Sequence, residues 1–154
     1  MSDLSEQAPC LAFFRIEGAP IAKGRPRVTR SGHTYTPKRT RDWEKMAVVS
    51  MRAQNATLQA LDEPLRVECR FVFSRPKATP KRASSARLPK PTRPDLDNLV
   101  KAVLDAGSKA GLYTDDARVV ETLASKWYAA VGETAHVELS IFSLSVPHGP
   151  EQPL

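Results

Sequence analysis

The stretch from residue 74 to residue 94 constrains the fold of this chain more than any other. It reads SRPKATPKRASSARLPKPTRP and contains five prolines. Proline has no backbone N–H and clashes with the preceding helical turn, so neither a helix nor a regular strand is expected to run through these residues. The segment also holds seven basic residues and no acidic one: Arg75, Lys77, Lys81, Arg82, Arg87, Lys90 and Arg93. We interpret residues 74–94 as a mobile basic arm.

Hydrophobic patterns on the N-terminal side of this arm predict two strands and a helix. Residues 11–16 are rich in aromatic and branched side chains, and residues 65–73 alternate between polar and apolar. Both patterns are typical of strands. Thr36 followed by Pro37 is typical of a helix N-terminus, with the threonine as N-cap, and it predicts a helix over 37–58.

On the C-terminal side, apolar residues at helical spacing predict a helix over 95–110, which Gly111 is placed to end. Residues 124–130 and 135–142 are predicted strands, and the short connection between them predicts that they pair as a hairpin. The order strand, helix, strand, helix, strand, strand indicates an α+β fold with a small mixed sheet packed against two helices. The length of 154 residues predicts one domain, over 11–145, between flexible tails at 1–10 and 146–154.

The charge of the chain indicates a polyanionic partner. The net charge is +6 and the sequence pI is about 9.6, and nucleic acid is the usual partner of such a protein. A second basic stretch follows the first predicted strand, over residues 21–45, and Gly24, Pro26 and Gly32 predict a loop in it before the helix begins. We expect the phosphate backbone to be bound by residues of both basic stretches: Lys23, Arg25, Arg27, Arg30, Lys38, Arg75, Lys77, Lys81, Arg82 and Arg93. The alternative for the arm is a linker that makes no contact.

Other function classes receive little support. Cys10 and Cys69 lack zinc-ligand spacing, and we expect two buried, reduced thiols. No apolar run approaches the roughly 20 residues that span a membrane, and the N-terminus lacks the pattern of a secretory signal, so we expect a cytoplasmic protein. The histidines, His33, His136 and His148, are scattered, and no nucleotide-binding glycine motif is present.

Three carboxylates stand out as candidates for chemistry: Asp95, Asp97 and Asp116. Hydrolysis of a phosphodiester needs a nucleophile and stabilisation of charge on the phosphate, and Mg²⁺, which prefers oxygen ligands, supplies both. Residues two apart on a regular helix do not face each other. Asp95 and Asp97 are therefore expected to share a metal only if the helix begins between them, with Asp95 at its N-cap.

Each of these residues also has a purely structural interpretation. An aspartate after a proline at a helix start is commonly just a cap. Asp97, Lys101 and Asp105 follow one another at intervals of four, which is typical of an ion-pair ladder along a helix. Asp115 and Asp116 are compatible with a simple turn. Spacing alone leaves both interpretations open.

The combined motifs nevertheless resemble a known family. The run RPDLDNLVKAVLDAGSKAGLYTDDARVVE is similar to the signature of RusA-type Holliday junction resolvases, with a D-x-D-N start, a lysine four residues after the second aspartate, and a closing D-D. The stretch IEGAPIAKGRPRVTRSGHTYTPKRTRDWE resembles the opening of that family, with its G-x-P, K-x-R-P-R and Y-T-P-K elements. The resemblance covers most of the chain, from about Phe13 to the last predicted strand.

The resemblance implies a homodimeric endodeoxyribonuclease that nicks four-way DNA junctions in pairs, using Mg²⁺ or Mn²⁺ as a substitute, and that is often carried by prophages. By position, it implies that Asp95, Asp97 and Asp116 are the catalytic metal ligands and that Lys101 is the essential lysine. Asp105 matches an aspartate of the motif that is not expected to be a ligand, and Asp115 is expected to have a supporting part. Two alternatives stay open: a nuclease for flaps or forks, and a branched-DNA-binding protein without activity.

Overall fold

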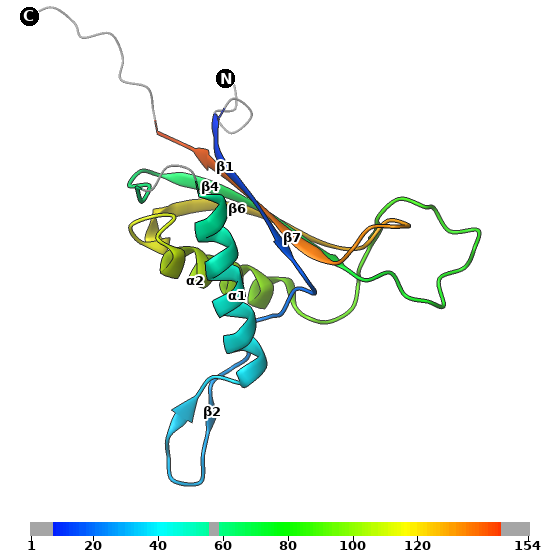
Figure 1. Cartoon of the computed structure of the whole chain (residues 1–154), viewed down its shortest axis with the longest axis horizontal. Helices are drawn as coiled ribbons and strands as arrows, with labels where there is room; N and C mark the ends of the chain where they lie inside the picture. Colours follow the sequence, from blue (N-terminus) through cyan, green and yellow to red (C-terminus); the bar gives the residue numbers. More distant parts are fainter. Residues whose placement is uncertain (1–7, 56–58, 146–154) are drawn as a thin grey trace, which may run out of the picture.

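The computed structural model describes residues 8–55 and 59–145 and shows one layer of sheet and one layer of helices (Figure 1). The predicted C-terminal tail, most of the predicted N-terminal tail and residues 56–58 of the first predicted helix lie outside the described residues. The elements are β1 (Cys10–Glu17), β2 (Arg27–Val28), β3 (Thr34–Tyr35), α1 (Lys38–Gln54), β4 (Leu65–Phe73), β5 (Leu88–Pro89), α2 (Leu96–Ala110), a 3₁₀ turn η1 (Asp116–Arg118), β6 (Val119–Tyr128) and β7 (His136–Ser143). The predicted α+β fold is confirmed.

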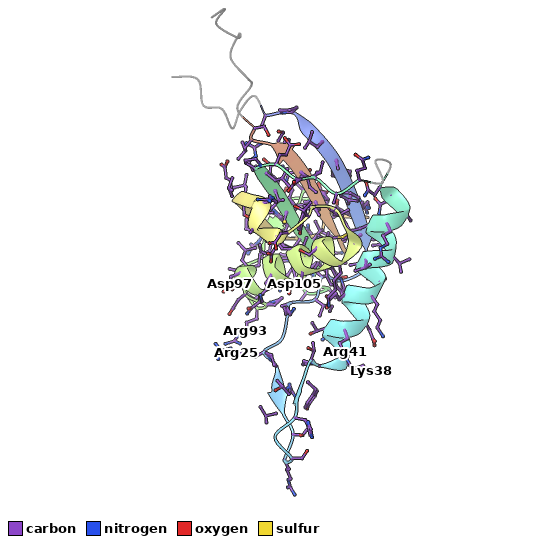
Figure 2. The ribbon with its side chains drawn as sticks, turned by 90° about the vertical axis from the view of Figure 1, so that its left-hand side faces the viewer. Arg25, Lys38, Arg41, Arg93, Asp97 and Asp105 are labelled. Atoms are coloured by element: carbon purple, nitrogen blue, oxygen red, sulfur yellow. The ribbon has the colours of Figure 1, made fainter. Side chains whose placement is uncertain are left out.

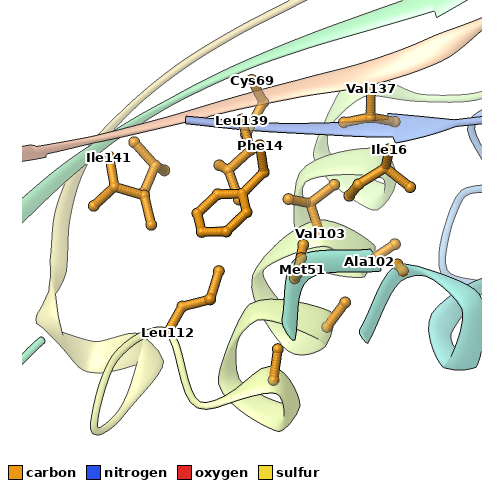
Figure 3. Packing of buried hydrophobic residues seen from close by; sticks show 14 of the residues in the cluster. Phe14, Ile16, Met51, Cys69, Ala102, Val103, Leu112, Val137, Leu139 and Ile141 are labelled. Atoms are coloured by element: carbon orange, nitrogen blue, oxygen red, sulfur yellow. The ribbon is translucent and has the colours of Figure 1, made fainter. Parts of the chain in front are cut away.

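The hydrophobic core lies between one face of the sheet and the two helices (Figure 3). Strand β4 shows why: Leu65, Val67, Cys69 and Phe71 alternate along it and all are buried. Side chains at i, i+2 and i+4 of a strand line one face, so this alternation turns the apolar face of β4 toward the helices. From the helix layer, Met51 of α1 and Val103 of α2 reach the same core and are fully buried. In the described part of the chain neither helix meets the length and apolarity needed to cross a membrane.

The main correction concerns the last two strands. The predicted hairpin between residues 124–130 and 135–142 is wrong, because β4 lies between β6 and β7 in the sheet order β1-β7-β4-β6-β5. Strand β6 pairs in parallel with β4, and β7 pairs antiparallel with β4 on its other side and with β1. A parallel pair needs a crossover, and α2 supplies it between β4 and β6. The short connection from β6 to β7 therefore crosses the end of β4 and is not a tight turn between neighbouring strands.

A small hairpin was not predicted. Within the expected loop, β2 and β3 pair antiparallel around a turn in which the Thr29 backbone N–H donates to the His33 carbonyl at 2.8 Å. Gly32 adopts a φ of 84° there, a conformation that glycine adopts at little cost. The hairpin extends away from the sheet and helices (Figure 1) and its residues are exposed. It carries Arg27 and Arg30 outward.

The proline-rich arm is tied to the sheet at several points. Its β5 pairs with β6, so the expectation that it contains no strand is wrong at that place. The Arg75 guanidinium donates to the carbonyls of Ser84, Ala86 and Ala129. Near its end, Arg87 donates to Glu133 and Glu138 at 2.7 Å each. These bonds join the arm to the connection between β6 and β7 and to β7 itself.

The two thiols differ in environment. Cys69 is buried on the core face of β4, as predicted, and burial, with a smaller effect from Glu68, raises the pKa of its thiol to about 12. Cys10 begins β1 and is exposed, so the expectation of two buried thiols is wrong for Cys10. It stands at the start of the edge strand, where the helices do not cover it.

Replacing Arg87 with Met should loosen the arm and lower the free energy of unfolding by about 2 kcal/mol at neutral pH, the scale of hydrogen bonds to charged groups. The Arg87 hydrogen bond is the first cause that lowers the pKa of Glu133 from 4.5 to about 2. A depressed carboxyl pKa stabilises the fold above the unfolded value and loses that effect as the pH falls. The difference in the free energy of unfolding between Arg87→Met and wild type should therefore shrink as the pH falls from 4.5 to 2.

Urea unfolding followed by tryptophan fluorescence at several pH values measures this difference. Arg82→Met is the matched control, because Arg82 is exposed on the same arm. A stability loss in Arg87→Met that stays constant down to pH 2 would contradict the role of the Glu133 pair.

Candidate active site

The start of α2 leaves the first candidate carboxylate available. Asp95 is the N-cap residue, as predicted, but its side chain makes no capping hydrogen bond. The chain before it is held from β6, where the Lys126 ammonium donates to the carbonyls of Thr92 and Pro94 at 2.6 and 2.8 Å. The Asp95 carboxylate is exposed. Its interpretation as a simple cap is thus not supported by the structure.

The stripe along α2 is not an ion-pair ladder. Asp97 and Lys101 are exposed, and within residues 8–55 and 59–145 no ion pair joins Lys101 to Asp97 or Asp105. Asp105 instead pairs with Lys23 from the loop after β1. Figure 2 shows Asp97 and Asp105 on the same helix, with Arg25 and Arg93 on the side toward the hairpin.

The loop after α2 carries the last two candidates, and buried contacts fix its path. Gly111 ends the helix in the left-handed region, at a φ of 76°. The buried Tyr113 then folds back and donates its hydroxyl to the Leu104 carbonyl at 2.6 Å. Gly107 allows this, because a Cβ there would lie 2.4 Å from the Tyr113 hydroxyl oxygen. Leu61 forms backbone hydrogen bonds with the residues on either side of Tyr113: its N–H donates to the Leu112 carbonyl, and its carbonyl accepts from the Thr114 N–H.

Asp115 and Asp116 follow directly. The Asp115 carboxylate accepts from the Ala117 backbone N–H at 2.7 Å and caps the 3₁₀ turn η1. This bond is the main cause that lowers the pKa of Asp115, with the neighbouring Asp116 carboxyl next. Asp116 is exposed beside it, and the supporting part expected for Asp115 in the site stays a prediction.

Two cavities meet at Lys23. The first, of about 360 Å³, contains most of the acidic side chains and is lined by Lys23, Asp105, Ser108, Lys109, Thr114, Asp115 and Asp116. The second, of about 650 Å³, is mainly basic and is lined by Ala22, Lys23, Gly24, Arg25, Arg93, Pro94, Asp95 and Asn98. Asp116 and Asp95 therefore line adjoining cavities, whereas Asp97 and Lys101 line neither of these two.

The arrangement does not present a ready-made metal site. Among residues 8–55 and 59–145, no group of three or more histidine, cysteine, aspartate or glutamate side chains converges closely enough to hold a metal ion. Asp95, Asp97 and Asp116 all belong to these described residues and form no such group here. Their role as metal ligands stays a prediction.

Most of the expected DNA-binding residues are exposed on two extensions. Arg27 and Arg30 belong to the hairpin, Arg25 precedes it in the chain, and Lys38 begins α1 after it. Lys77, Lys81, Arg82 and Arg93 are exposed on the arm. Figure 1 shows the hairpin and the arm as separate extensions of the sheet and helices, and the cavity shared by Arg25 and Arg93 connects their bases. Arg75 differs, because its guanidinium is engaged within the arm.

The basic stretch that begins at Lys23 continues onto α1, where it forms a third basic surface. A cavity of about 560 Å³ is lined by Arg41, Glu44, Lys45, Val48, Val49, Arg52 and Lys109. Lys109 also lines the acidic cavity and pairs with the buried Glu44. The spacing of Arg41 and Lys45, one helical turn apart, was a signal that these cations share a face.

Comparisons with known proteins gave a family match and a similar protein. Residues 17–141 match the model of the family described as endodeoxyribonuclease RusA. The chain is also 30% identical over 141 residues to the uncharacterized protein YqaN of Bacillus subtilis (strain 168), covering 86% of this chain and 96% of that protein. The matched residues include the hairpin, the arm, α2 and the acidic loop.

Replacing Gly107 with Ala should destabilise the protein by about 1–3 kcal/mol, the usual cost of overpacking. Alanine favours a helix interior over glycine by about 1 kcal/mol. Here, however, the new Cβ would lie 2.4 Å from the Tyr113 hydroxyl oxygen and 2.9 Å from its Cζ. Tyr113 and the acidic loop must shift to admit it.

Thermal unfolding of four proteins tests this: wild type, Gly107→Ala, Tyr113→Phe and the double variant. Because Tyr113→Phe removes the nearest atom, Gly107→Ala should cost less in that background. A rise in the stability of Gly107→Ala above wild type would show that the contact does not fix the loop.

Proposed function

The chain belongs to the RusA endodeoxyribonuclease family, and from this membership we propose that it resolves four-way DNA junctions by paired, Mg²⁺-dependent hydrolysis of phosphodiester bonds. The observation that carries the proposal is the family match over residues 17–141, which spans both basic extensions and every candidate carboxylate. A net charge of +6 supports DNA as the partner. The similarity to YqaN adds no activity, since that protein is uncharacterized.

The proposed part of the two extensions is to hold the DNA backbone. Their exposed arginines and lysines neutralise phosphates without reading bases. The hairpin and the arm lie on different sides of the start of α2 (Figure 1), so DNA held by both would pass the Asp95 end of the helix. A branched substrate offers more than one duplex arm to such separated surfaces.

The proposed carboxylates are Asp95, Asp97 and Asp116, with Lys101 as an accompanying cation. RusA family nucleases generally depend on a divalent metal. The described carboxylates form no group of three, so the side chains as arranged do not fit a metal without rearrangement. The Mg²⁺ requirement, with Mn²⁺ as a substitute, is thus proposed from the family and the D-x-D-N motif.

The proposed assembly is a homodimer. A four-way junction has near-two-fold shape, and two symmetric copies of one site suit a pair of symmetric nicks. This proposal also rests on the family.

Cleavage of a labelled four-way junction tests the function, with Mg²⁺, Mn²⁺ or EDTA. Wild type should make paired nicks only with the divalent ion. Asp97→Asn should lose at least about 100-fold in rate, as expected when a carboxylate acts on the reacting groups, while it still binds the junction. Asp42→Asn is the matched control, since Asp42 is an exposed aspartate of α1 outside both cavities around Lys23.

The same assay separates the alternatives. Equal rates on flaps, forks and junctions would support a broader nuclease of branched DNA. Tight junction binding without nicks under any metal condition would support the binding protein.

The hairpin contribution is tested by salt dependence. Replacing Arg27 and Arg30 together with Ala should weaken junction binding and reduce the slope of log affinity against log salt concentration by about 2, or about 1 for each lost phosphate contact. Fluorescence anisotropy in EDTA from low to high salt measures this slope. An unchanged slope would place the hairpin away from the DNA.

A further inference from the structure

Lys23 stands apart from the other basic residues of its loop. Its ammonium pairs with Asp105 Oδ2, and the two side chains are only 26% and 19% exposed. The backbone N–H of Lys23 donates to the Asn98 carbonyl at 3.1 Å, which ties the loop to the first turn of α2. Arg25, two residues later, is exposed. The two cations of one loop therefore have different surroundings.

The Lys23 ammonium compensates the negative charge of Asp105, which would be unfavourable without a cation beside it. Asp105 lies in the middle of α2 and shares its cavity with Asp115 and Asp116. A half-buried carboxylate beside two others is unfavourable unless a cation accompanies it. Lys109, which also lines this cavity, is paired with Glu44 on the side of α1. Lys23 is thus the cation that accompanies Asp105.

Its place between the cavities suggests what it does. Lys23 lines the cavity that contains Asp116 and the cavity that contains Asp95. We infer that Lys23 is a positioning residue of the acidic cavity, acting through Asp105, and not a contact of the DNA backbone. It holds the loop after β1 against α2 and fixes the side chain of Asp105 in the cavity that contains Asp116. This inference rests on the proposed function and replaces the expectation that Lys23 binds phosphate.

Two measurements on Lys23→Met and Arg25→Met test the inference. Junction affinity is measured in EDTA over a range of salt, and the single-turnover nicking rate is measured with Mg²⁺ at saturating enzyme. Lys23→Met should keep its affinity within about twofold and keep the salt slope, while its saturating rate falls about 10- to 100-fold, the scale for groups that orient active-site residues. Arg25→Met should lose affinity and about 1 from the slope.

A double-variant cycle adds a second readout. Asp105→Asn should lower the saturating rate as Lys23→Met does, and the double variant should be no slower than either, because both remove one pair. Thermal unfolding shows whether Lys23→Met folds. If it does not fold, Asp105→Asn tests the inference in its place.

Lys23→Met with a reduced slope and an unchanged saturating rate would overturn the inference. If wild type makes no nicks, the proposed function fails, and the affinity measurements in EDTA still decide whether Lys23 contacts DNA.

Discussion

The parallel pairing of β4 with β6 is the constraint on which the rest of the structure depends. Antiparallel strands can be joined by a short turn, but a parallel pair needs a long crossover that packs on the sheet. Here α2 is that crossover, and its apolar stripe is buried in the core on one face of the sheet (Figure 3). One end of α2 therefore lies where the arm finishes, and the other lies where the acidic loop turns back. Both ends of the candidate site are placed by one packing interaction, between a helix and the sheet that it crosses.

Local patterns predicted the elements better than their partners. The alternation of residues 65–73 and the stripe of residues 95–110 are strong signals, and both elements occur within one residue of the predicted bounds. The helix predicted from Thr36 and Pro37 also occurs. Its N-cap is Pro37 and not the predicted Thr36, and no side chain caps the helix by a hydrogen bond. The predicted hairpin failed because pairing depends on which strand lies between two others, and a short connection does not report that. The small β2–β3 hairpin was missed because its strands are too short for any periodicity.

The candidate site shows the same difference between local patterns and tertiary contacts. Motif spacing singled out Asp95, Asp97 and Asp116 as candidates, and Asp95 occupies the N-cap position that spacing required. Spacing could not show that Asp105 turns to Lys23, since these residues are 82 positions apart and the i,i+4 lysine was the nearer candidate. Nor could composition separate Arg75 and Arg87, which hold the arm together, from Lys77, Lys81 and Arg82, which are exposed on it. A cation is structural or available for a partner according to its tertiary contacts, and these are invisible in a basic stretch.

A basic protein that carries an acidic cavity must reconcile two opposed requirements. Phosphates are attracted by the extensions and repelled by carboxylates, and the repulsion grows as water is excluded. The fold separates the charges that meet each requirement. Lys23 and Lys109, the two cations that line the acidic cavity, are each paired with an acidic partner. Exposed cations of the hairpin and the arm, such as Arg27, Arg30, Lys77 and Lys81, line neither cavity around Lys23, whereas Arg25 and Arg93 at the bases of these extensions share a cavity with Asp95. Salt should therefore weaken the outer contacts more than the Lys23–Asp105 pair, because partly buried ions are screened less. Affinity for DNA and the organisation of the acidic cavity are on this argument two separable properties of one small domain.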